Sequence, residues 1–278
     1  MNVSRRTLLK GSAAAPLLGV AACASTVFEP PTRIERERDD GVFHIGNSTH
    51  LVVIDGLHIL TDPWLRDPAD GVLLHRVPPA PLPTHPDVVL ITHEHEDHFD
   101  VTALALVDKR ATVVEPVWLE ARTKALGFTD VRTSKAGAVL ADVRGLKIEA
   151  VEALHDVIEV CYRVQMGDRS FFFGGDTLPT TQIEALAARA PVDLALLPAD
   201  GGALLGKRYV MNPEEAIAMA ERFGVRAANK GALLTHHECS VAFPWGAIVD
   251  VKPPVLSDFP PWFKVPVPGA RTPFPWAT

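Results

Sequence analysis

The chain contains few cysteines, no long apolar run and no cluster of basic residues. Only three of its 278 residues are cysteine, which is too few for the disulfide framework of a small secreted domain. Cys161 and Cys239 could form at most one bridge outside the cytoplasm. No stretch approaches the roughly 18 consecutive apolar residues of a transmembrane helix. These features exclude a disulfide-rich scaffold and a membrane-spanning helix in the mature chain.

The charge pattern argues against a nucleic-acid partner. The formal net charge is −7, and lysine and arginine are not clustered along the chain. A protein that binds nucleic acid needs clustered basic side chains to neutralise phosphates. With 47% hydrophobic and 22% charged residues, the composition is that of a globular protein with one large or two small cores.

Residues 1–22 have the layout of a signal peptide, with a basic start, an apolar stretch and small residues at the end. The segment SRRTLLK resembles the twin-arginine export signal, with Arg5 and Arg6 as the pair and Leu8 where that signal usually has Phe. A generic signal peptide with two chance arginines is the alternative. Removal of this segment takes away three basic residues and no acid, so the formal charge would move from −7 to −10.

The end of this segment, Val20-Ala21-Ala22-Cys23, resembles the lipobox of bacterial lipoproteins, in which the cysteine becomes the acylated first residue. Acyl chains on Cys23 would hold the protein at a membrane surface, with about 0.8 kcal/mol from each buried methylene. Cleavage that leaves a free cysteine is the alternative. Residues 23–40 follow as a polar, Pro-containing tether. We therefore expect an exported, periplasmic or cell-surface lipoprotein of a bacterium.

Residues 41–278 indicate a single domain of strands with interspersed helices. Short β-rich runs such as VFHI, HLVVID and PDVVLIT bound apolar helix patterns. The clearest helix start is MNPEEAIAMAERFG, where Asn212 caps, Pro213 takes the first helical position and Glu215 completes a capping box. From Lys252 the chain is Pro-rich, and we expect no regular structure there. This order of elements predicts layered sheets with helices outside.

The segment THEHEDHFD, residues 92–100, concentrates three histidines and four acids directly after the apolar run VVLI. His93 and His95 are two residues apart in extended chain, so their imidazoles project to the same side and can share a metal ion. Asp97 and His98 supply a carboxylate and a third imidazole for a neighbouring ion. A solvated polar loop is the alternative, but H-x-H-x-D-H after a buried strand is a specific spacing.

With this motif the sequence resembles the metallo-β-lactamase fold superfamily. More narrowly it is similar to the branch of the L-ascorbate-6-phosphate lactonases and the N-acyl phosphatidylethanolamine phospholipase D enzymes. The resemblance covers residues 41 to about 250 and is carried by HIGNSTHLVVIDGLHILTDPWL, PDVVLITHEHEDHFD, FFFGGDT, LALLP, MNPEEA and LLTHH. It implies an α/β fold, a four-layer αββα sandwich with the metal site at the edge of the two sheets.

The resemblance also implies seven metal ligands, and the chain has a residue for each. Three histidines would hold the first ion: His93, His95 and His155. Three further residues would hold the second: Asp97, His98 and a histidine of the segment THH. Asp176, in GGDT, would bridge the two ions.

The last histidine is either His236 or His237. The family's final histidine precedes an aromatic residue and Gly-Thr-Phe, whereas this chain has LLTHHECS. The register points to His237, with His236 as the alternative. The residues after it, 238–240, differ from the family pattern and change the wall of the pocket.

Asp62, in LTDPW, matches an aspartate that the family places behind the metal loop, where such a group orients ligands. An ordinary turn-capping role is the alternative. The remaining histidines have no metal spacing, and we expect them to be structural or on the surface: His44, His50, His58, His75 and His85.

The implied function is that of a metal-dependent hydrolase with two divalent ions, Zn²⁺ or else Mn²⁺ or Fe²⁺. A hydroxide that bridges the metals would attack an ester, lactone or phosphodiester, and Asp97 would orient it or carry a proton. An aspartate at position 176 disfavours β-lactam hydrolysis. The expected partners are a small-molecule or lipid substrate and, through Cys23, a membrane surface. The alternative is a lipid-anchored metal-binding or sensing protein without turnover, which the altered segment HHECS supports.

Overall fold

The computed structural model describes residues 40–67, 73–204, 207–242, 248–249 and 255–273. The predicted signal peptide, Cys23 and all but the last residue of the predicted tether lie outside the described residues. Every described residue belongs to one unit, Pro31–Thr278. None of the helices in these ranges is long and apolar enough to cross a membrane.

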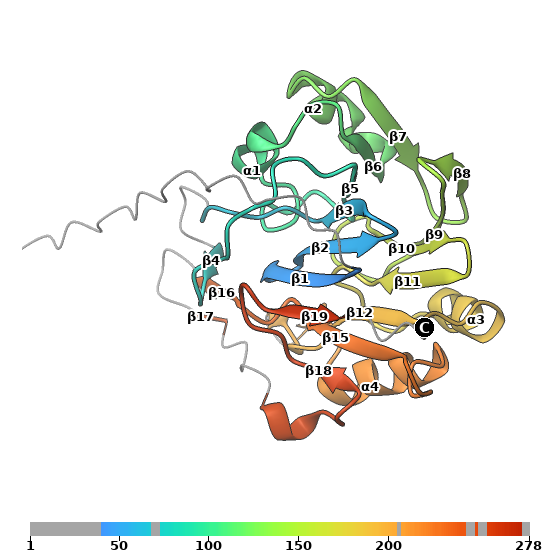
Figure 1. Ribbon diagram of the computed structural model, residues 1–278. Helices are drawn as coiled ribbons and strands as arrows, with labels where there is room; N and C mark the ends of the chain where they lie inside the picture. The colour runs from blue at the N-terminus through green and yellow to red at the C-terminus, as the bar shows by residue number, and fades with distance from the viewer. Residues whose placement is uncertain (1–39, 68–72, 205–206, 243–247, 250–254, 274–278) are drawn as a thin grey trace, which may run out of the picture. The chain divides into compact units, whose positions relative to one another are not determined.

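Two seven-stranded sheets form the centre of the described chain (Figure 1). The first has the order β19-β1-β2-β3-β5-β6-β7. Its strands are β1 Gly41–Gly46, β2 Thr49–Ile54, β3 Leu57–Thr61, β5 Val88–Leu90, β6 Thr112–Pro116, β7 Asp130–Ser134 and β19 Arg271–Pro273. The second has the order β18-β15-β12-β11-β10-β9-β8. Its strands are β8 Val139–Val143, β9 Leu146–Glu152, β10 Val160–Met166, β11 Arg169–Phe173, β12 Leu194–Pro198, β15 Gly231–Thr235 and β18 Phe263–Lys264.

Apolar side chains from both sheets, among them Val52, Val114, Phe171 and Phe173, form the core between them. The outer face of the first sheet is covered by α1 Val101–Leu106, the 3₁₀ turn Val117–Leu119 and α2 Glu120–Ala125. The outer face of the second is covered by α3 Thr181–Arg189 and α4 Pro213–Arg222. These four layers confirm the predicted αββα sandwich.

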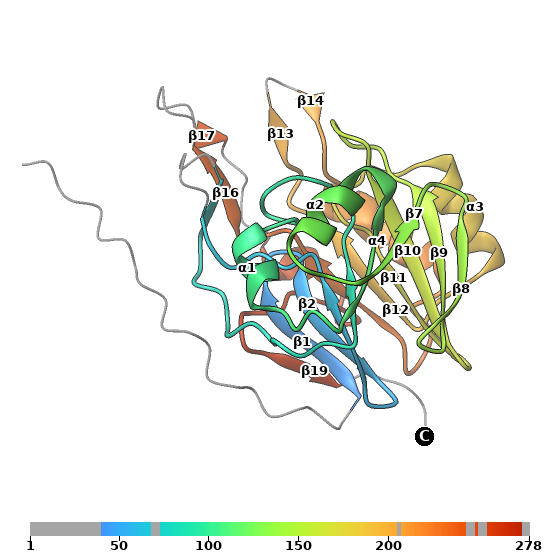
Figure 2. The same ribbon diagram turned by 90° about the horizontal axis from the view of Figure 1, so that it is seen from above.

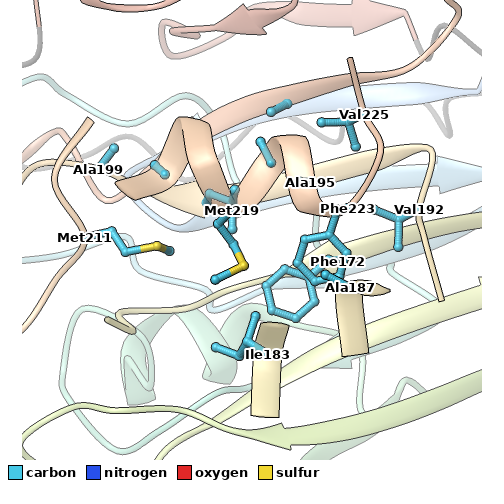
Figure 3. Close-up of a cluster of buried hydrophobic side chains, with 14 of the residues drawn as sticks. Phe172, Ile183, Ala187, Val192, Ala195, Ala199, Met211, Met219, Phe223 and Val225 are labelled. Atoms are coloured by element: carbon cyan, nitrogen blue, oxygen red, sulfur yellow. The ribbon is translucent and has the colours of Figure 1, made fainter. Parts of the chain in front are cut away.

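Helices α3 and α4 pack on the second sheet through a separate apolar cluster (Figure 3). The rings of Phe172 from β11 and Phe223 after α4 stack with their centroids 4.4 Å apart. The predicted capping box begins α4: Asn212 Oδ1 accepts from the Glu215 backbone N–H, and Glu215 accepts from that of Asn212. The predicted helix start is therefore confirmed.

The Pro-rich C-terminal region corrects one expectation. It contributes β18 to the second sheet, parallel to β15, and β19 to the first sheet, antiparallel to β1. Each strand is only two or three residues long, because proline cannot donate to a ladder and restricts strands to the edges of sheets. The sequence rule therefore missed the two edge strands.

Strand direction determines where the site lies. In the first sheet β3, β5 and β6 are parallel, and in the second β11, β12 and β15 are parallel. The loops that follow their carboxyl ends gather at one edge of each sheet, a usual place for functional residues. Two short ribbons also leave from this edge (Figure 2). They are β13 Ala203–Leu204 with β14 Lys207–Arg208, and β4 Leu73–His75 with β16 Cys239–Ala242 and β17 Ile248–Val249.

Candidate metal centre

The loop after β5 presents the H-x-H-x-D-H motif. It closes as a tight turn, because the backbone N–H groups of His98 and Phe99 both donate to the carbonyl of His95. Asp100 anchors the end of the loop: it caps α1 through the Thr102 N–H and accepts from the Leu65 N–H at 3.0 Å. The backbone fixed in this way aims the motif's side chains at the second sheet.

Three histidines form a first group of potential ligands. His93 Nε2 lies 3.0 Å from His95 Nδ1, and His155 Nε2 lies 3.2 Å from the same atom. His155 comes from the loop between β9 and β10, on the other sheet. The structure thus brings together the three residues expected to hold the first ion.

Four buried residues form a second group: Asp97, His98, Asp176 and His236. Asp176 Oδ2 lies 3.2 Å from His98 Nε2 and 3.0 Å from His236 Nε2. Asp97 Oδ2 lies 3.2 Å from His236 Nε2 and 3.5 Å from His98 Nε2. The two groups adjoin, because the rings of His93 and His98 have centroids 4.1 Å apart.

The geometry corrects the register chosen at the last histidine. β15 ends at Thr235, and His236 adopts a left-handed backbone with φ 53°. This turn, held by the His236 N–H on the carbonyl of Asn47, directs the ring of His236 towards the carboxylates. His237 instead places Nε2 3.1 Å from the carbonyl of Pro266. The structure thus groups His236, the alternative to His237, with the carboxylates.

Hydrogen bonds fix which nitrogen of each imidazole carries the proton. His98 Nδ1 donates to Asp62 Oδ2 at 2.7 Å, and His236 Nδ1 donates to Asp200 Oδ2 at 3.0 Å. His155 Nδ1 donates to the carbonyl of Tyr209 at 3.3 Å. A carboxylate or carbonyl can only accept, so Nδ1 of each ring carries a proton, and Nε2, which faces the cluster, is the nitrogen left to bind a metal ion or a further proton.

The tautomer of His93 is fixed in the same way, but through the hydroxyl of Thr92. The Thr92 hydroxyl donates to Asp62 Oδ2 at 2.7 Å and must therefore accept from His93 Nδ1 at 3.0 Å. The Nε2 of His93 is then a bare lone pair. Four imidazole lone pairs and two carboxylates, Asp97 and Asp176, converge on one small space. The donor set is that of borderline divalent cations such as Zn²⁺, so the residues fit the metal ions that the resemblance implies.

The electrostatics of the buried cluster require positive charge. Burial opposes ionisation of Asp97, but the neighbouring imidazoles His98 and His236 outweigh it and hold its pKa well below its usual range. Burial likewise opposes protonation of His98, but Asp176 and Asp97 raise its pKa well above its usual value. Cations or protons must therefore occupy the cluster.

Asp62 lies behind the metal loop, as the resemblance implies. It is fully buried, and its Oδ1 accepts from the Thr92 N–H at 2.8 Å while its Oδ2 accepts from His98. Thr92 and His98 are thereby held at a fixed separation. Asp62 thus orients two of the histidines, His93 through Thr92 and His98 directly.

Sequence reasoning missed two further orienting acids. Glu159 is fully buried beside His93 Nδ1, at 3.3 Å, and accepts from the Asp176 N–H at 2.8 Å. Burial raises the pKa of Glu159 to about 7. Asp200 holds His236, as described above. Asp200 follows the strand LALLP and could have been found as a strand-end acid, whereas nothing in the sequence connects Glu159 with His93.

A third group lies beside the first two and contains residues expected to be structural. His44 Nε2 is 3.0 Å from Glu238 Oε2 and His44 Nδ1 is 3.0 Å from His50 Nε2, all three residues being buried. His237 stacks on His44 with centroids 5.5 Å apart. Glu238 also accepts from the Asn47 N–H. The altered segment HHECS therefore packs into a polar network that joins β1 and β2 to the end of β15.

Three comparisons place the chain among known proteins. A family model described as a beta-lactamase superfamily domain matches residues 42–227. An uncharacterized protein of Mycobacterium tuberculosis is 30% identical over 249 residues, which cover 81% of this chain and 66% of that protein. The chain thus spans just under two thirds of the length of this relative.

Two further similarities concern proteins named for hydrolysis. A metal-dependent hydrolase of Methanopyrus kandleri is 27% identical over 189 residues, covering 64% of this chain and 76% of that protein. The crystal structure of a possible metal-dependent hydrolase from Veillonella parvula has a TM-score of 0.69 at 17% identity, covering 84% of this chain and 99% of that one. At this identity the structural similarity shows the fold alone.

Proposed function

Because the chain belongs to the β-lactamase superfamily domain family, we propose that it is a metal-dependent hydrolase that holds two divalent ions and cleaves an ester, lactone or phosphodiester. The observation that carries the proposal is the convergence of four bare imidazole nitrogens and two carboxylates in the two adjoining groups. Names of relatives such as the M. kandleri metal-dependent hydrolase agree with this class of reaction.

The residues of the two groups can be assigned to two separate ions. We assign His93, His95 and His155 to one ion, and Asp97, His98 and His236 to the other. We assign Asp176, whose Oδ2 lies 3.2 Å from His98 Nε2 and 3.0 Å from His236 Nε2, as the residue that the two ions would share. When bound, the ions would bring the pKa of a water to about 7 and stabilise negative charge that develops on the substrate oxygen.

Asp97 is the residue that we assign to orient the attacking water. Its Oδ2 is within 3.2 Å of His236 Nε2 and also within 3.4 Å of the Asn47 side-chain N–H. A carboxylate held from two sides keeps a fixed direction, which a water-orienting group needs. Asp62, Glu159 and Asp200 keep the surrounding imidazoles in their tautomers.

The placement of the protein in the cell is part of the same proposal and is supported by the sequence of residues 1–23. We propose export by a twin-arginine route and anchoring through acylated Cys23. That route would carry a folded chain, so the metals could be inserted before transport, and metal binding and folding are coupled. A membrane anchor is compatible with a lipid or a small-molecule substrate.

The test is a screen of the purified, metal-loaded protein against bis(p-nitrophenyl) phosphate, p-nitrophenyl acetate and a set of lactones. We expect turnover of at least one class and about two bound ions per chain. Asp176→Asn should abolish turnover and lower the metal content, whereas Asp142→Asn, at an exposed position on β8, should change neither.

Absence of turnover on every substrate at full metal occupancy would contradict the proposal. The same result would favour the second candidate, a lipid-anchored metal-binding or sensing protein. The observation in favour of that candidate is the buried network of His44, His50 and Glu238 beside the site, where a substrate-binding wall is expected.

A further inference from the structure

His75 was expected to be a structural or surface histidine, yet it lies in the wall beside the metal ligands. It ends β4, which pairs with β16 in antiparallel register so that His75 lies opposite Cys239. Side chains opposite each other in such a pair point to the same side of the ribbon, with Cβ atoms about 5 Å apart. Cys239 Sγ is itself 4.0 Å from His236 Nε2. One side chain therefore separates His75 from a proposed metal ligand.

The ring of His75 is held in a fixed orientation from two directions. Asp67 Oδ1 accepts from the backbone N–H of His75 at 2.8 Å and from its ring Nδ1 at 2.7 Å. The indole of Trp64, a completely buried residue, stacks on the imidazole with centroids 3.4 Å apart and planes inclined by 17°. The imidazole can neither flip nor tilt without losing one of these contacts.

The second ring nitrogen of His75, Nε2, is buried and makes no hydrogen bond to the described residues. Only 6% of the His75 side chain is exposed. Leaving a buried polar atom unpaired costs about 1–3 kcal/mol. The carboxylate of Asp67 fixes the proton on Nδ1, so Nε2 carries the lone pair.

Several acids surround His75, and one of them, Asp97, is a proposed metal ligand. Burial lowers the pKa of His75, and Asp67, Asp97 and Asp100 oppose that shift. Glu238 also interacts electrostatically with this ring. Burial therefore favours the neutral imidazole, which can accept a proton at Nε2, and Asp67, which accepts from Nδ1, stabilises the cation that results.

We infer that His75 is a catalytic proton carrier for the reaction, with Asp67 and Trp64 as its positioning residues. The inference rests on the proposed hydrolase function. An acid held on one imidazole nitrogen, with the other nitrogen bare in a site, is the arrangement that serves proton transfer in hydrolytic enzymes generally.

The proton balance of the step is as follows. The oxygen of the attacking water forms a bond to the carbonyl carbon or phosphorus, and the proton that the water loses goes to His75 Nε2. The bond from that centre to the leaving oxygen breaks, and its electron pair stays on the leaving oxygen. His75 Nε2 returns the proton to this oxygen, so that an alcohol departs and the histidine is again neutral.

The test compares leaving groups that differ in their need for a proton. Substrates of the hydrolysed class are prepared with p-nitrophenyl, which departs readily as an anion, and with phenyl, which departs less readily. Because general acid catalysis contributes about 10²–10⁴-fold, His75→Gln should lose at least about 100-fold in kcat/KM on the phenyl substrate and less than about tenfold on the p-nitrophenyl substrate. An equal loss on both would overturn the inference.

Two further variants separate proton transfer from structural damage. Asp67→Asn keeps an oxygen that can accept from the backbone N–H and the ring of His75 but removes the negative charge that stabilises the protonated ring, so it should show a smaller loss with the same preference for the good leaving group. His85→Gln removes another histidine paired with an aspartate, Asp108, at an exposed site, and should change neither rate. A His85 effect as large as that of His75 would also overturn the inference.

A measurement without substrate completes the test. Long-range ¹H–¹⁵N NMR of the wild-type protein should show the His75 imidazole with its proton on Nδ1 and a bare Nε2, and Asp67→Ala, which removes the acceptor, should disturb this tautomer. A proton on Nε2 in the wild type would contradict the inference directly. If the wild-type protein turns over none of the substrates, the proposed hydrolase function is refuted. If it is active but His75→Gln shows no dependence on the leaving group, only the role of His75 is refuted.

Discussion

Replacing Gly175 by alanine should lower the free energy of unfolding by roughly 2–5 kcal/mol. Gly175 has a φ of 57°, and a Cβ there would overlap Glu159 Oε1 and come within 3.0 Å of Thr92 Cγ2. An alanine in the left-handed region costs about 1–2 kcal/mol. Displacing Glu159 from the buried Asp176 N–H adds about 1–3 kcal/mol. Because Asp176 and His93 lose a common support, metal affinity should fall as well.

Gly137 provides the matched control. Its φ is 82°, but no atom lies within 4 Å of the position of a Cβ, so Gly137→Ala should show only the backbone cost. Urea unfolding of the metal-loaded variants gives the free energies, and competition with a chelator gives the affinities. If Gly175→Ala loses no more stability and affinity than Gly137→Ala, the argument from Glu159 is refuted. Adding Glu159→Ala to Gly175→Ala should remove the overlap and make the two effects clearly non-additive.

Three further predictions address the ligand, a buried acid and the anchor. His236→Ala should lower the affinity for one ion by more than about 100-fold, which exceeds the loss expected for residues that only orient a ligand. His237→Ala should have no such effect. If chelator competition shows the larger loss for His237→Ala, His237 is the ligand, as the sequence predicted. Burial raises the pKa of Glu115 from 4.5 to about 7. The protonated carboxyl therefore stabilises the folded state below pH 4.5, and this contribution is lost as the pH rises through 7. The free energy of unfolding should fall by roughly 3 kcal/mol over this range. Glu115→Gln should flatten this dependence in urea unfolding between pH 5 and 8, and an unchanged slope would show that the carboxyl is ionised in the folded state. Cys23→Ser should move the protein from the membrane fraction to the soluble fraction, and retention in the membrane would rule out the lipobox.

The sequence was most informative where the ligands are close along the chain. The H-x-H-x-D-H motif could be interpreted because a strand and a turn place its side chains with little help from the rest of the fold. The family match over residues 42–227 confirms the assignment to the superfamily, and with it the αββα architecture. His155 and Asp176 became candidates through the family resemblance, and the position of each after a strand agrees with it.

The rest depended on contacts between distant segments. Glu159 reaches His93 and Asp176 only after the two sheets have packed together, and no spacing in the sequence connects them. His75 becomes part of the wall only because β4 pairs with β16. The structure groups His236, and not His237, with the carboxylates because a single left-handed residue at the end of β15 decides which ring faces them, and a register borrowed from relatives does not record that turn.

The loops at the two ends of the strands differ in their role. The ligand loops all leave from one edge, while the opposite edge holds the hairpin turns at Asp55–Gly56, Arg144–Gly145 and Gly167–Asp168, several of them in left-handed conformations. These turns are local, and they lie a strand's length from the metal ligands. A fluorescent label, an affinity tag or a surface tether could therefore be inserted there to follow or immobilise the protein. Lengthening a loop at the other edge would instead displace the proposed metal ligands.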